Sequence, residues 1–204
     1  MDEHGNKQAF VQILDGKNST SEYIKFPFES FKASPNKHII EIDKNRFTTH
    51  SIDLHLQNIK GSLKFQNVTP WSSSFFSPGI MGPFSFVPFM ECYHGILSMD
   101  HSITGELFIK GKKVDFRGGR GYTEKDWGHS FPIGYVWIQS NHFGEPKISF
   151  KCSIAKIPFK MFSFNGFIAG LWIKNKLIEF TTYNFSKVKS CKINDKEVQI
   201  EIEN

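Results

Sequence analysis

The residues best suited to chemistry lie in one short stretch, from Gly118 to Phe143, which reads GGRGYTEKDWGHSFPIGYVWIQSNHF. Two carboxylates, Glu124 and Asp126, stand there beside tryptophan, tyrosine and histidine residues. Glycines precede them and relax the backbone. This composition is typical of a loop that a ligand or another backbone segment approaches closely. We therefore expect the Glu-Lys-Asp-Trp-Gly motif to lie in a loop, with Trp127 as one of its ligand contacts.

A predicted strand follows this motif. Because side chains alternate along a strand, Tyr135, Trp137, Gln139 and Asn141 fall on one face. That face carries aromatic rings followed by neutral amides, and we interpret it as a candidate substrate-binding surface.

A second polar group stands upstream, in the predicted strand from Met90 to Met99. Glu91 and Tyr93 lie on one of its faces, and His94 lies on the other. Polar residues are unusual among such apolar neighbours, so we include all three among the candidate site residues.

The motifs of this stretch, together with two upstream runs, resemble those of a known family. Tyr122-x-Glu-Lys-Asp-Trp-Gly128, then Phe131-Pro132, then Trp137-x-Gln-x-Asn-x-Phe143 resembles the signature of the tocopherol cyclase family. The upstream runs SPGIMGPF and FMECYHG are similar to bacterial members of that family. The resemblance covers roughly seventy residues and implies a lipocalin-like β fold with an apolar cavity.

The resemblance also implies a reaction. A cyclase of this kind protonates an isolated double bond of a prenyl tail, and a phenolic oxygen captures the cation, without a redox cofactor. The matching acids are Asp126, Glu124 and Glu91, and burial would keep such a carboxyl protonated near neutral pH. Asp126 is favoured as the donor, although many family members carry Asn there. Aromatic faces would stabilise the carbocation.

Other readings remain open. The same motif could instead hold the fold together, with a carboxylate that accepts backbone hydrogen bonds and Trp127 as a plug. The protein could also be a noncatalytic carrier of a hydrophobic molecule, or a structural module whose 22 phenylalanines fill its own interior. No HExxH or HxH spacing is present, so histidines could form a metal site only if the fold brings them together, and we expect no metal site.

Composition narrows the possible partners and the cellular location of the protein. A net charge of +5 without a nucleic-acid-binding motif argues against nucleic acid as a partner. Three scattered cysteines, and acidic residues where a signal peptide would be basic, predict a reducing, cytoplasmic location. The apolar stretch 75–90 is broken by prolines and glycines, so we expect no transmembrane segment, although peripheral membrane contact is possible.

Short alternating segments predict the elements that position these residues. We expect strands at 8–14, 21–28, 38–43, 47–57, 61–68 and 147–157, and hairpins at 105–116, 164–183 and 192–202. The irregular stretch 71–88 would line a cavity or form a packed crossover. The fold class is therefore all-β: an antiparallel lipocalin-like barrel or sandwich, possibly an incomplete two-barrel arrangement. We expect one β domain over 1–204, or a fragment of two barrel halves with a boundary near 118–146.

Overall fold

A computed structural model describes residues 5–88, 90–132, 134–145, 147–159 and 162–203. The protein is all-β with antiparallel sheets, as predicted. The described residues contain no α-helix, only three short 3-10 turns: η1 (Phe28–Ser30), η2 (Gly82–Phe86) and η3 (Thr182–Asn184). Among the described strands no sheet closes into a barrel. No described helix has the length and apolarity needed to cross a bilayer.

The chain forms two compact units. The first contains residues up to Gln66 together with Ser102–Gly119, and the second contains Asn67–His101 together with residues from Arg120 onward. The long strand β8 (Cys92–Ile109) contributes residues to both.

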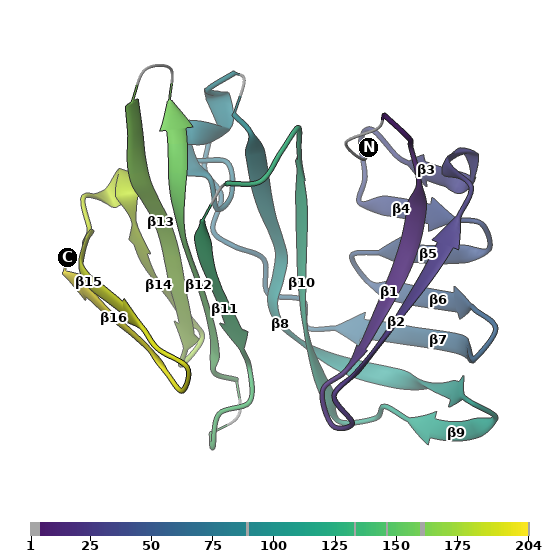
Figure 1. Cartoon of the computed structure of the whole chain (residues 1–204). Helices are drawn as coiled ribbons and strands as arrows, with labels where there is room; N and C mark the ends of the chain where they lie inside the picture. The colour runs from purple at the N-terminus through teal and green to yellow at the C-terminus, as the bar shows by residue number, and fades with distance from the viewer. Residues whose placement is uncertain (1–4, 89, 133, 146, 160–161, 204) are drawn as a thin grey trace. The chain divides into compact units, whose positions relative to one another are not determined.

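The first unit begins with a hairpin of β1 (Ala9–Asp15) and β2 (Thr20–Phe26). An antiparallel succession follows, which Figure 1 shows from β3 to β9. Its remaining strands are β3 (Phe31–Ala33), β4 (Ile39–Ile42), β5 (Asn45–Thr48), β6 (Ser51–His55), β7 (Ile59–Gln66), the later part of β8, and β9 (Lys112–Asp115).

One strand prediction in this unit is wrong. The stretch 47–57 was expected to be a single strand, but it is divided between β5 and β6. The break is a local hydrogen-bonded turn in which the Thr48 hydroxyl accepts from the backbone N–H groups of His50 and Ser51, at 3.1 and 2.9 Å. The local turn replaces ladder hydrogen bonds, so the chain reverses there.

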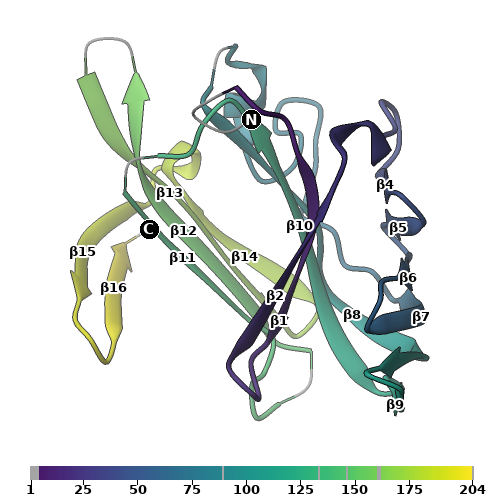
Figure 2. The ribbon, with the colours of Figure 1, turned by 45° about the vertical axis from the view of Figure 1, so that its right-hand side comes forward.

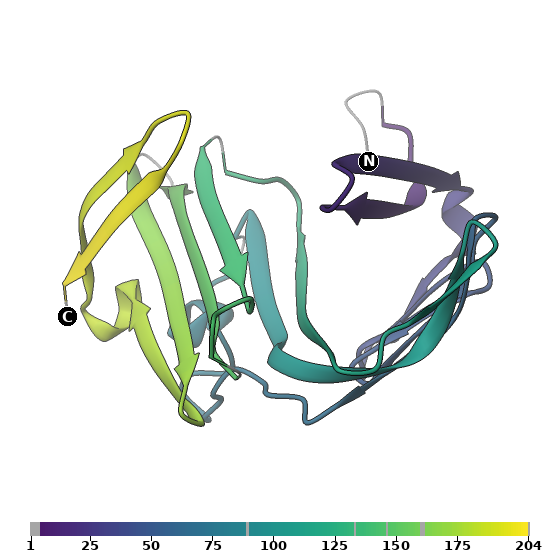
Figure 3. The same ribbon diagram turned by 90° about the horizontal axis from the view of Figure 1, so that it is seen from below.

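The second unit is built around a four-stranded antiparallel sheet in which β11, β12, β13 and β14 lie side by side in that order (Figure 2). A hairpin of two further strands follows it along the chain (Figure 3). The bounds are β10 (Gly119–Gly128), β11 (Tyr135–Ser140), β12 (Ser149–Phe159), β13 (Phe162–Ile173), β14 (Lys176–Thr181), β15 (Lys187–Ile193) and β16 (Val198–Glu203).

The core of the second unit comes largely from the irregular stretch 71–88. Trp71, Ile80 and Met81 are buried there against Ile96 and Met99 of β8. The stretch is thus a packed crossover, and it also lines the pockets described below. Both interpretations of this stretch apply to it.

Candidate active site

The Glu-Lys-Asp-Trp-Gly motif is not in a loop, which corrects the sequence prediction. It lies at the end of strand β10, which neighbours β8 in the sheet. Strand alternation puts Tyr122, Glu124 and Asp126 on one face of β10. His94, on the first part of β8, meets that face, and all four residues belong to the second unit.

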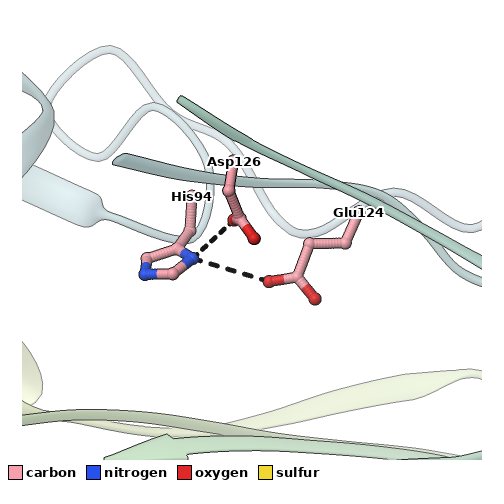
Figure 4. Close-up of side chains that lie close together, drawn as sticks. All are labelled: His94, Glu124 and Asp126. Carbon is pink, nitrogen blue, oxygen red and sulfur yellow. Dashed lines mark hydrogen bonds and ion pairs between the residues drawn. The ribbon is translucent and has the colours of Figure 1, made fainter. Parts of the chain in front are cut away.

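His94 lies against two carboxylates (Figure 4). Its Nδ1 atom is 2.6 Å from Oδ1 of Asp126 and 3.6 Å from Oε1 of Glu124. The short contact is a charge-assisted hydrogen bond in which Nδ1 is the donor. The Nε2 atom points away from both carboxylates in Figure 4, and it is therefore free of them.

Glu124 connects strand β10 to the sheet of β11 and β12. Its Oε2 accepts hydrogen bonds from the Tyr122 hydroxyl at 2.7 Å and from Nε1 of Trp137 at 3.1 Å. Its Oε1 lies 3.7 Å from Nζ of Lys151 on β12. The Glu124 side chain is only 8% exposed, so these contacts act in a largely dehydrated space.

The pKa of Glu124 results from two opposed effects. Burial raises it, but the contact with His94, the charge of Lys151 and the hydrogen bonds from Tyr122 and Trp137 outweigh burial and bring the pKa to about 2. Glu124 is therefore ionised near neutral pH. The expectation that burial keeps this carboxyl protonated is wrong.

His94 is affected in the opposite sense. Burial lowers its pKa, but the hydrogen bond to Asp126 and the contact with Glu124 more than compensate, and the net result is a pKa raised above the ordinary histidine value. The two carboxylates thus favour the imidazolium form of His94 more than water does around a free histidine. The cluster combines this imidazole, an ionised glutamate and the neighbouring aspartate.

An apolar pocket adjoins the cluster. It measures about 60 Å³ and is lined by His94 and Glu91 together with mostly apolar residues, among them Met81, Phe84, Ala155 and Phe164. His94 is also in the wall of a second hollow, of about 470 Å³, with Ile80, Tyr93 and Trp127. His94 is the one member of the cluster that reaches both.

The remaining upstream candidates take other positions. Glu91 lines the apolar pocket, and among the described residues its side chain makes no hydrogen bond or ion pair with the cluster. Its backbone carbonyl accepts from the N–H groups of His129 and Ser130. Tyr93 stacks on Trp127, with ring centroids 5.7 Å apart, and its hydroxyl donates to the Val87 carbonyl. This aromatic pair lines the second hollow.

The candidates on β11 do share a face, as predicted, but they differ in exposure. Tyr135 and Trp137 are 62% and 46% exposed, whereas Asn141, just beyond the strand, is only 6% exposed. Gln139 pairs directly with Lys151 across β11 and β12. The aromatic part of this face is therefore the more open part, Gln139 is half-buried and Asn141 is buried.

Two members of the site were missed in the sequence. Tyr122 stands two residues before Glu124, a spacing that indicates a shared face once β10 is recognised as a strand. Lys151 alternates with the apolar residues Phe150 and Cys152, a pattern that is typical of a solvent-facing lysine. It is instead fully buried, because both faces of β12 are covered.

The cluster also has the donor set of a metal site. One ligand atom each from His94, Glu124 and Asp126 lies within 4.8 Å of the others. A divalent ion there would need a neutral imidazole and would compete with His94 and Lys151, which already contact the carboxylates.

Comparison with known proteins agrees with the resemblance in the motifs. The profile of the family described as "Tocopherol cyclase-like" matches residues 16–193. The chain is 27% identical over 100 residues to a "Probable tocopherol cyclase, chloroplastic" of Oryza sativa subsp. japonica, which covers 47% of this chain and 21% of that protein. It is 36% identical over 56 residues to a "Tocopherol cyclase, chloroplastic" of Zea mays, which covers 28% and 12%. The chain thus aligns with no more than about a fifth of either relative, and it belongs to the tocopherol cyclase-like family.

Proposed function

We propose that this protein catalyses an acid-dependent isomerisation of an isoprenoid, in the simplest case ring closure of a prenylated hydroquinone. The observation that carries the proposal is His94, whose imidazole is held by two carboxylates at the wall of an apolar pocket. Family membership supports a hydrophobic substrate.

The proton donor in this proposal is Nε2 of His94. Nδ1 is engaged with Asp126, so Nε2 carries the proton that can be transferred. The proton adds to one carbon of the double bond and leaves a tertiary cation on the other. The phenolic oxygen then forms the C–O bond, and its proton returns to Nε2. Substrate and product have the same composition, so no oxidant or reductant is needed.

The two carboxylates have supporting roles. Asp126 fixes the ring of His94 through the 2.6 Å contact and stabilises its charge. Glu124, ionised in the buried space behind, adds negative charge near the developing cation. Asp126 is thus a positioning residue, whereas the sequence favoured it as the donor. Glu91, which also lines the pocket, remains the alternative acid.

Aromatic rings line the same space. Phe84 and Phe164 lie 6.4 Å apart between ring centroids, and both face the pocket. Their faces can stabilise a carbocation. We infer that this pocket is part of a lipocalin-like cavity. At about 60 Å³ it is far below the roughly 300–1,000 Å³ of a typical ligand site, so binding requires it to widen.

Product analysis tests the proposal. Wild-type protein incubated with a prenylated hydroquinone should give a chromanol of unchanged mass and shifted retention. His94→Gln should abolish product, while His142→Gln, an exposed histidine outside the site, should leave it unchanged. Loss of product in Glu91→Gln with full activity in His94→Gln would overturn the assignment of the donor.

A noncatalytic carrier is the second candidate, and the ionised state of Glu124 favours it, because one of the three expected acids cannot donate a proton near neutral pH. A carrier would bind the hydroquinone and release it unchanged in all of these variants.

We further propose that the protein takes its ligand from a membrane surface. Phe75 and Phe76 are 85% and 78% exposed, and they precede the residues that line the second hollow. Replacing both by serine should reduce co-sedimentation with lipid vesicles, and Phe185→Ser, which removes an equally exposed ring, should not. Equal losses in both variants would contradict the proposal.

A further inference from the structure

Several buried hydrogen-bond donors share one face of the second unit's four-stranded sheet. The proposed reaction does not use them. In the part of the chain that the structure describes, Nζ of Lys151, Nε2 of Gln139, Nδ2 of Asn141 and Oγ of Ser149 are all buried without a hydrogen-bond partner. Lys151 and Ser149 have no exposed surface at all.

Strand pairing places these residues together. Gln139 and Lys151 are direct partners across β11 and β12, and the same register, continued by one step past Ser140 and Phe150, puts Asn141 opposite Ser149. Directly opposed side chains have Cβ atoms about 5 Å apart, and the next pair on the same face is about 7 Å away. The four groups therefore form two adjacent pairs on one face.

The unpartnered atoms of these four side chains are all donors or can act as donors: the Lys151 amine, two amide N–H groups and a serine hydroxyl. The nearest unpartnered acceptor is Oε1 of Glu124. A buried donor that is left without an acceptor destabilises the folded protein. Lys151 has a charge partner, Glu124, but at 3.7 Å their contact is an ion pair beyond hydrogen-bond length. Its N–H groups remain available to another acceptor.

We propose that these four residues form a binding site for the carboxylate head group of an amphiphilic ligand. A carboxylate accepts only, and its two oxygens offer about four lone-pair sites, which matches three nitrogen donors and one hydroxyl. A positive side chain within the group favours an ionised oxygen over a neutral one.

The surroundings supply a place for the apolar part of such a ligand. Ser153 and Ala155 continue the same face of β12 beyond Lys151, and both line the apolar pocket. On β13, the residue paired with Lys151 is Gly170, and the ring of Trp71 lies where its side chain would be. The head-group site is thus bordered by apolar surface.

Calorimetric titration with three ligands of one chain length tests this inference. Decanoate should bind more tightly than decanol by about tenfold or more, as expected for a charge-assisted hydrogen bond, and decylamine should bind most weakly. Lys151→Met should bring decanoate and decanol to within about twofold of each other, because the cation that selects the head group is gone. Lys156→Met, which removes an exposed lysine of the same strand, should leave the preference intact.

Equal binding of the three ligands to the wild-type protein, or no binding of decanoate, would overturn the inference even if Lys151→Met fails to fold. A preference that survives in a folded Lys151→Met protein would do so too. The inference does not rest on the proposed function, because these titrations involve no turnover.

Discussion

At Glu124, burial raises the pKa, whereas the contacts with His94 and Lys151 and the hydrogen bonds from Tyr122 and Trp137 lower it and prevail. These four neighbours surround a carboxylate whose side chain is only 8% exposed. Its ionised form is therefore the stable one. We therefore assign the acid role to His94, whose pKa is raised by Asp126 and Glu124.

The depressed pKa of Glu124 predicts a stability effect. A lowered folded-state pKa contributes stability that is present above the unfolded value of 4.5 and is lost as the pH falls toward about 2. Glu124→Gln should remove this contribution, roughly 3 kcal/mol at neutral pH, and flatten the acid limb of a urea-unfolding series. Glu106→Gln, at an exposed ion pair with Lys113, should change stability by less than about 1 kcal/mol. Equal effects of the two substitutions would contradict the assignment.

His94 predicts the opposite dependence. Its folded-state pKa is raised, so its contribution to stability is complete below the ordinary value of 6.5 and is lost as the pH rises through the folded-state value. In an NMR titration the His94 ring protons should shift at a higher pH than those of a free imidazole. Asp126→Asn should return that midpoint toward the ordinary value. A His94 midpoint below 6.5 in the wild-type protein would show that burial prevails instead.

At this scale the sequence predicted the types of residue but not their roles. Glu124, Asp126 and His94 were all named as site residues, because they stand in the motifs that resemble the family. Which acid is ionised could not be predicted, because it depends on Lys151 and Trp137, which reach Glu124 only through the fold.

Among the elements, strand β10 shows why the glycines before the Glu-Lys-Asp-Trp-Gly motif did not mark a loop. Gly118 has the positive φ, 81°, that marks a turn, but Gly121 lies within the strand against the ring of His101. That glycine is required for close packing and not for backbone freedom. The two uses look alike in a sequence.

Gly121→Ala should therefore destabilise the second unit. An added Cβ would lie 2.8 Å from two carbon atoms of the His101 ring, which is itself 2% exposed and cannot move aside easily. We expect a loss of about 1–3 kcal/mol in the free energy of unfolding, measured by urea denaturation. Gly134→Ala, where nothing lies within 4 Å of the new Cβ, is the matched control. A neutral Gly121→Ala would mean that the ring relaxes.

The hairpins were predicted well because their turns are local. The hairpin expected at 105–116 is present, and Leu107 pairs with Val114 as expected, although the turn lies at Lys110 and Gly111 and not at Gly111 and Lys112. The turns near Asn175 and Asn194 also join the expected strands. The strand 47–57 failed because a single threonine hydroxyl turns the chain inside an otherwise alternating pattern.

For the whole molecule, alternation and strand length predicted the antiparallel all-β class correctly. They could not predict whether a sheet closes into a barrel, and none of the described sheets does. Closure depends on pairing between strands far apart in the sequence, for which a periodic pattern carries no information. The family profile spans residues of both units, whereas every residue of the candidate site lies in the second.

Because the candidate site lies in the second unit, ligand binding should stabilise that unit. On addition of a prenylated hydroquinone, amide hydrogen exchange should slow in β10, β11 and β12, because ligand binding stabilises the elements that hold it. Exchange in β4, β5 and β6 of the first unit should stay unchanged and serves as the internal reference. Protection confined to the first unit would place the ligand site elsewhere.

The most direct test of the central claim is the reaction carried out in heavy water. If His94 delivers a solvent-exchangeable proton to a double bond, each product molecule must carry one deuterium on carbon, and mass spectrometry should show a product one mass unit heavier. His94→Gln should give no such product. A chromanol formed by the wild-type protein without carbon-bound deuterium would contradict protonation as the chemical step, whatever the effect of the mutation.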